Sequence, residues 1–207
     1  MSKQKDLGNA VREQGGLKKT TGNMSELVFD PVSGEFVVKD KDAALSEGEE
    51  IVTEMTNNGF AASIGHMTSE RYEAEKRVLG QKLPPNAYLF KEENGRPYVL
   101  LAARTNNKNV YTIWIDLEDF PENTPRAGTT KMLKSKDGNN LDSSSGAMHT
   151  LTSMHDGTCI CHYGDNEWTP MVSLYKIYVK CRLWLEIYEG YHLKTGKPID
   201  YYLKHAH

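Results

Sequence analysis

Residues 87–117 decide the fold of this chain and read AYLFKEENGRPYVLLAARTNNKNVYTIWIDL. Three runs in this stretch, 87–90, 97–103 and 109–117, are rich in the aliphatic and aromatic residues that favour strands. Glu93-Asn94-Gly95 separates the first two runs, and Asn-Gly is a strong signal for a tight hairpin turn. The stretch therefore predicts an antiparallel meander of three strands.

Helical patterns lie on both sides of this meander. Thr68 or Ser69 can cap a helix that runs to about Leu79, with Gly80 as its C-cap. A longer helix is predicted over 172–194, entered at 169–170 and closing near 195–196, and a short one follows over 199–203. Apolar residues at alternating spacings of four and three form the predicted inner face of the longer helix: Leu174, Tyr178, Cys181, Leu185 and Tyr188.

Residues 126–158 connect the meander to the second helix and hold few large apolar residues. We expect a long loop here, with at most a weak strand around 129–133. The order helix, antiparallel meander, loop, helix predicts an α+β domain.

The first 66 residues differ from the rest. We expect a basic arm over 1–24, a small hairpin over 26–38 and an acidic helix over 42–58. Gly65-His66-Met67 resembles the remnant of a cloning site, so two interpretations stay open: a separate piece fused at this point, or a natural linker. Either interpretation divides the chain into an extension, 1–66, and a domain, 67–207.

Composition limits the possible functions. The net charge of −3 and a pI near 6.2 argue against a dedicated nucleic-acid binder, which would be basic. No run approaches the ~20 apolar residues of a membrane span, and no signal peptide is recognisable. Three cysteines, an odd number, do not suggest a disulfide framework, so we expect a reducing, cytoplasmic environment.

Candidate chemistry is concentrated within twenty residues: His149, His155, Cys159, Cys161, His162 and Trp168. A zinc site is one hypothesis, but zinc sites usually use Cys-x₂₋₄-Cys pairs, and here one residue separates the cysteines and no second pair exists. A second hypothesis is inert burial, which suits Cys181 in the apolar face of its helix. A third is a nucleophilic thiolate, activated in a loop near a helix N-terminus and close to imidazoles.

A family resemblance favours the nucleophile. Ile160-Cys161-His162-Tyr163 with Glu167-Trp168, then Trp184-Leu185-Glu186-Ile187-Tyr188-Glu189 and Thr195-Gly196, resembles bacterial members of the ubiquitin-conjugating enzyme (UBC) family. Those proteins place a cysteine several positions before a tryptophan, followed by a long Trp-Leu-x-x-Tyr-Glu helix that ends in Thr-Gly. Residues 119–125 stand at the place of the family's Tyr-Pro…Pro turn, and His149 where the family often has a histidine. The resemblance covers residues 67–207.

The resemblance implies a UBC-like fold and a transferase that needs no metal or organic cofactor. Such an enzyme accepts a protein C-terminus from an activating enzyme as a cysteine thioester and passes it to an amine. The carried protein is a ubiquitin-like protein or, in CBASS-type antiviral operons of bacteria, the C-terminus of a cGAS-like nucleotidyltransferase.

The resemblance also assigns roles to residues. Cys161 matches the family's cysteine pattern, with Cys159 as the alternative nucleophile because its spacing from the histidine is closer to that of eukaryotic members. His162 and Asp165 are candidates to take the proton of the amine, although Asp165 can equally be a turn residue. Thr150-Leu151 follows His149, so the asparagine of the eukaryotic His-Pro-Asn motif has no counterpart. A UBC-like binding module without activity remains the alternative to an enzyme.

Overall fold

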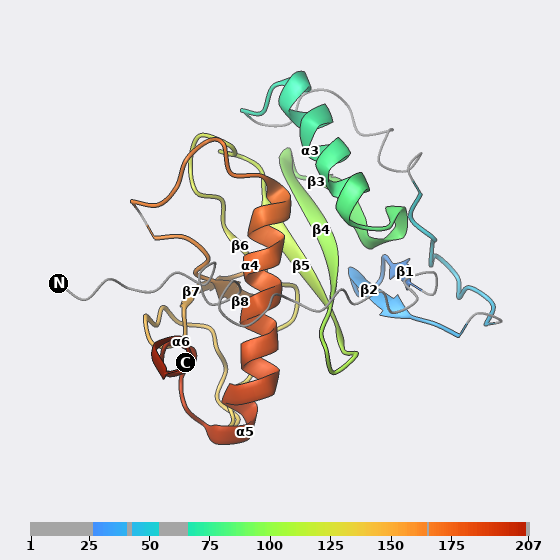
Figure 1. Ribbon diagram of the computed structural model, residues 1–207. Helices are drawn as coiled ribbons and strands as arrows, with labels where there is room; N and C mark the ends of the chain where they lie inside the picture. The colour runs from blue at the N-terminus through green and yellow to red at the C-terminus, as the bar shows by residue number, and fades with distance from the viewer. Residues whose placement is uncertain (1–26, 41–42, 54–65, 165, 206–207) are drawn as a thin grey trace.

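The computed structural model describes residues 27–40, 43–53, 66–164 and 166–205. The chain is α+β, with a six-stranded antiparallel sheet in the order β3-β4-β5-β6-β8-β7 (Figure 1). The strands of this sheet are β3 Tyr88–Glu93, β4 Arg96–Arg104, β5 Val110–Asp116, β6 Ala127–Thr129, β7 Thr150–Met154 and β8 Gly157–Ile160. The predicted meander is confirmed as β3–β4–β5, and Asn94 and Gly95 form its first turn with positive φ.

Two long helices pack beside the sheet. The first, α3, spans Ser69–Lys82 with Thr68 as its N-cap, so it passes through Gly80 and the predicted C-cap is wrong. The second, α4, spans Leu174–Ile187 and lies across one face of the sheet (Figure 1). It begins at the Ser173 N-cap rather than at Thr169-Pro170, since the Ser173 hydroxyl accepts the Lys176 N–H.

The long helix continues beyond α4. A π-helical segment, η3 Tyr188–His192, leads into α5 Leu193–Thr195, and Gly196 ends the helix with φ +75°. The short helix α6, Ile199–His205, follows, and a 3₁₀ turn, η2 Pro85–Ala87, precedes β3. The predicted inner face of the long helix is confirmed, because the five residues that define it are all buried: Leu174, Tyr178, Cys181, Leu185 and Tyr188.

Two charged residues of α3 form hydrogen bonds with the backbone at the start of α4. Arg71 donates to the backbone carbonyls of Pro170 and Val172 and to the Glu75 carboxylate, 2.8 Å away. Glu75, also in α3, accepts the backbone N–H of Leu174 at 2.8 Å. Burial raises the pKa of Glu75, but these bonds from Arg71 and Leu174 oppose the rise. The start of α4 is therefore fixed by α3.

The opposite face of the sheet is covered by a hairpin from the N-terminal part of the chain. The predicted hairpin is confirmed as β1 Leu27–Asp30 and β2 Glu35–Val38. Phe36 donates its N–H to the Thr112 hydroxyl in β5, and Asn86 donates to the Leu27 carbonyl. The described part of residues 1–66 thus shares a core with the sheet, made of Leu27, Phe29, Phe36, Val52, Ala87, Leu89, Leu100, Ala102, Trp114 and Cys159.

Two predictions for the connecting segments are wrong. Residues 43–53 contain no helix, because Glu50 pairs with Phe29 beside the hairpin and Val52 enters its core; residues 54–58 and the basic arm lie outside the described residues. Residues 126–158 are not one long loop, because β6, β7 and the start of β8 form there. The turn between β7 and β8 uses His155 and Asp156 at positive φ and lacks the glycine that marks the most recognisable hairpin turns. Among the described helices, none is long and apolar enough to cross a bilayer.

The strands β6 and β8 approach each other closely at two glycines. A Cβ on Gly128 would lie 2.2 Å from the Thr158 carbonyl oxygen, and one on Gly157 would lie 1.7 Å from that of Thr129. These contacts involve backbone, which cannot rotate away as a side chain can. Glycine is therefore required at both positions on steric grounds.

Gly157→Ala should lower the free energy of unfolding by about 2 kcal/mol or more, because the new methyl group has to displace a strand. Gly146→Ala is the matched control: nothing lies within 4 Å of its Cβ position, so we expect a change within about 0.5 kcal/mol. Urea unfolding measures both changes. Equal stability of the two variants would contradict the observed packing of β6 on β8.

Candidate active site

The three cysteines occupy different environments. Cys181 is buried in the inner face of α4, and Cys159 is buried in β8 on the hairpin side of the sheet. Cys161 follows the last residue of β8 and is partly exposed, with its Sγ 3.9 Å from the Tyr163 carbonyl oxygen. The expectation that both Cys159 and Cys161 lie in a loop is therefore wrong for Cys159, because strand β8 includes it.

Burial separates the cysteines chemically. It raises the pKa of Cys159, although Arg126, whose Nη2 lies 3.8 Å from Sγ, acts in the opposite direction. It raises the pKa of Cys181 far above its ordinary value. A thiol reacts as its thiolate, so neither buried cysteine is placed for nucleophilic chemistry. The contact between Arg126 and Cys159 could not be predicted from the sequence, because 33 residues separate the two along the chain.

His149 lies beside Cys161. Thr150 pairs with Ile160, and one step further along the two strands the His149 carbonyl accepts the N–H of Cys161 at 2.8 Å. The imidazole is largely buried, and its Nε2 lies 3.8 Å from Oδ1 of Asp200 in α6. The backbone of His149 has φ +52°, a left-handed conformation that is uncommon for residues other than glycine. The structure thus brings the backbone of this predicted residue to the cysteine, while its ring lies next to Asp200.

His162 is buried and held by the loop before β6. Its Nε2 lies 3.0 Å from the Pro125 carbonyl oxygen, which can only accept, so this nitrogen carries the proton. Burial lowers the pKa of His162 to about 4, and the charge of Lys180 acts in the same direction. The other ring nitrogen, Nδ1, is buried without a hydrogen-bond partner among the described residues. A neutral, buried imidazole of this kind anchors the segment after Cys161.

Aromatic side chains pack behind the segment that carries Cys161. The Tyr163 ring packs edge-to-face against Trp168, with centroids 5.4 Å apart, and the Nζ of buried Lys180 lies 3.4 Å from its centroid. Trp168 Nε1 donates to the Pro121 carbonyl at 3.0 Å, which supports a packing role. The sequence does not indicate that Lys180 packs behind this segment, because it lies within an otherwise apolar helix face. Asp165 lies outside the described residues.

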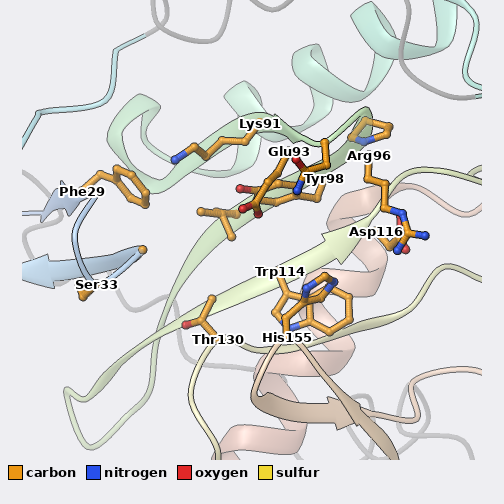
Figure 2. Close-up of a pocket in the computed structure, with 14 residues that line it drawn as sticks. Phe29, Ser33, Lys91, Glu93, Arg96, Tyr98, Trp114, Asp116, Thr130 and His155 are labelled. Atoms are coloured by element: carbon orange, nitrogen blue, oxygen red, sulfur yellow. The ribbon is translucent and has the colours of Figure 1, made fainter.

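His155 lies in a different environment. It is exposed in the turn between β7 and β8, and its ring packs edge-to-face on Trp114 with centroids 4.9 Å apart. Both rings line a cavity of about 710 Å³ between hairpin β1–β2 and the sheet (Figure 2). Tyr98 and the charged side chains of Lys91 and Arg96 also line it, but no cysteine does. We therefore place the candidate chemistry at Cys161 and not in this cavity.

The described residues contain no group of three or more His, Cys, Asp or Glu side chains arranged to hold a metal ion. The zinc hypothesis therefore has no ligand set in that part of the chain. Comparison with known proteins leaves the family open: no family model, curated protein or solved structure matches the chain.

A limiting amount of iodoacetamide at neutral pH should modify Cys161 at least about ten times faster than Cys159 or Cys181, because Cys161 is partly exposed and the other two are buried. Tryptic peptide mapping will separate Cys181, and fragmentation of peptide 137–176 will distinguish the other two. Faster labelling of either buried cysteine would overturn the assignment.

The buried imidazole of His162 also predicts how stability depends on pH. Its pKa is about 4 in the folded chain and near 6.5 when unfolded, so the unfolded state binds the extra proton and stability falls as pH drops through this window. Between pH 7 and pH 5 the loss should be about 2 kcal/mol in urea unfolding. His162→Gln can keep a donor near Pro125 and should remove this part of the pH dependence. An unchanged pH dependence in the variant would show that His162 is not the group responsible.

Proposed function

We propose that this chain is a ubiquitin-conjugating-like transferase that carries a protein C-terminus as a thioester on Cys161. One observation carries the proposal: of the three cysteines, only Cys161 is partly exposed while the other two are buried, and it lies at the end of β8, where its backbone N–H bonds to His149. The order of helix α3, meander β3–β4–β5, cysteine and long helix α4 is compatible with a UBC-like fold. The motifs of residues 160–168 and 184–196 support the same proposal.

The proposed chemistry is two successive acyl transfers. The Cys161 thiolate attacks the carbonyl carbon of the activated C-terminus and forms a new C–S bond, while the C–S bond to the activating enzyme breaks and its cysteine leaves as a thiolate. An amine then attacks the same carbon through a tetrahedral oxyanion, loses a proton, and expels the Cys161 thiolate as the amide forms. Much of the rate should come from the position of the amine relative to the thioester.

The surrounding residues suit different parts of this reaction. The His149 carbonyl accepts the N–H of Cys161, and the Nε2 of the His149 ring lies 3.8 Å from Oδ1 of Asp200. His162 is buried and bonded to Pro125, so we propose that it positions the chain after Cys161 and is not the proton acceptor. Asp165 remains the sequence-based candidate for that acceptor.

The proposed partners rest on the resemblance alone. They are an activating enzyme and either a ubiquitin-like protein or the C-terminus of a cGAS-like nucleotidyltransferase. We propose a role in bacterial antiviral defence, in the cytoplasm, on the same grounds.

Charging assays test the proposal directly. Incubated with its activating enzyme, the carried protein and ATP, the wild type should form an adduct that excess thiol removes, because thiols cleave thioesters and leave amides intact. Cys161→Ala should abolish the adduct, and Cys161→Ser should trap an oxyester that resists thiol. Intact mass measurement and gels with and without reductant report both outcomes.

Cys159→Ala is the matched control and should still charge. If only Cys159→Ala loses the adduct, the enzyme proposal survives with the wrong nucleophile. If the wild type never charges with the partners encoded beside it, or both alanine variants still charge, the transferase proposal fails and a UBC-like binding module is the better account.

A further inference from the structure

Three rings on the long helix form a stack beside the candidate site. The Trp184 and Tyr188 rings lie 5.3 Å apart at 12°, and the Tyr188 and His192 rings lie 6.0 Å apart at 24°. Trp184 and Tyr188 belong to the motif at 184–189, to which the proposed chemistry assigns no task. We call these three residues the aromatic ladder.

The π-helical segment explains how the ladder stays aligned. In an α-helix, four residues overshoot a full turn by about 40°, so residues four apart drift around the helix. The wider turn of the π-helix contains more residues, so four residues fall short of a full turn and the drift is reversed. Segment η3, Tyr188–His192, therefore returns His192 to the face that carries Trp184. Such π segments are frequent at functional sites.

Each ring of the ladder bonds to the backbone of the loop before β7. Trp184 Nε1 donates to the Met148 carbonyl at 2.8 Å, and the Tyr188 hydroxyl donates to the Lys134 carbonyl at 2.8 Å. His192 Nδ1 lies 2.8 Å from the Lys197 carbonyl oxygen and must donate to it, which leaves Nε2 to accept the Lys136 N–H at 3.3 Å. The ladder thus holds both ends of segment 134–148.

This loop determines where His149 lies. A left-handed backbone at a non-glycine residue persists only where its surroundings over-determine it. The two residues before His149 are held in this way: Met148 by Trp184, and Ala147 by the backbone N–H of Asp200 at 2.9 Å. The His149 carbonyl in turn accepts the N–H of Cys161. A displacement of loop 134–148 would therefore also displace Cys161 through its hydrogen bond to His149.

We propose that the aromatic ladder Trp184–Tyr188–His192 is a positioning device, which holds loop 134–148 and so fixes His149 beside Cys161. Its effect on acyl transfer rests on the proposed function. Its effect on the loop does not, and can be measured without any partner protein.

Tyr188→Phe tests the ladder with the smallest change, because it keeps the ring and removes only the hydroxyl bonded to Lys134. Tyr178→Phe is the matched control on the same helix, since its hydroxyl donates to Ala102 in β4 at 3.2 Å, away from the loop. Both variants should lose similar thermal stability. Hydrogen exchange of amides in 134–148 should accelerate about five-fold in Tyr188→Phe and stay unchanged in Tyr178→Phe. Equal exchange in the two variants would overturn the proposal.

The functional arm measures transfer from the charged thioester to an amine. Tyr188→Phe should lower kcat about ten-fold with little change in KM for the amine, because positioning and not amine binding is affected. Faster exchange without a loss of kcat would overturn the link to Cys161. If the wild type forms no thioester, the proposed function fails and the ladder is judged on hydrogen exchange alone.

His192→Phe provides a second variant should Tyr188→Phe not fold. It keeps a ring in the stack and removes both ring nitrogens, including the acceptor for Lys136. We expect the same acceleration of exchange, concentrated at the Lys136 end of the loop. Unchanged exchange there would equally overturn the proposal.

Discussion

The close approach of β6 and β8 is the constraint on which the candidate site depends. Gly128 and Gly157 leave no room for a Cβ, so two short strands meet at a separation that other residues would prevent. This contact joins the second half of the chain to the meander β3–β4–β5. It also sets the two sides of β8: Cys159 enters the core under the hairpin, Ile160 faces the helices, and Cys161 emerges where the strand ends. Cys161 is thus partly exposed because it follows the last residue of β8, whereas Cys159 is buried within the strand.

Both faces of the sheet are buried, one by helices and the other by a hairpin, and the two sides of the sheet have different roles. Helices α3 and α4 bury one face, and the Arg71–Glu75 pair fixes where α4 begins. Hairpin β1–β2 buries much of the other face and borders the cavity lined by Trp114 and His155. The helical side of the sheet carries the residues that we propose to act together with Cys161. The hairpin side makes residues 27–53 part of the packed structure, whatever the origin of the junction at 65–67.

The sequence predicted those elements whose signals are local. Asn94-Gly95 between strand-like runs predicted the first hairpin of the sheet, and the four-three spacing from Leu174 to Tyr188 predicted the inner face of the long helix. Strands β7 and β8 were missed because they are short, partly polar, interrupted by an irregularity between Leu151 and Met154, and joined by His155-Asp156. Because strand β8 was not predicted, the burial of Cys159 within it was not predicted either. The resemblance singled out His149 and Cys161 as candidate residues, whereas their backbone pairing, Asp200 and the aromatic ladder depend on tertiary contacts that no local pattern encodes.

The most direct measurement of the central claim is the position of the acyl group on the charged protein. The adduct should be digested at acidic pH, where thioesters survive, and the branched peptide sequenced by tandem mass spectrometry. The account predicts that the carried C-terminus is attached to the sulfur of Cys161 within the segment Cys159-Ile160-Cys161. Attachment to Cys159, to Cys181 or to a lysine side chain would contradict it.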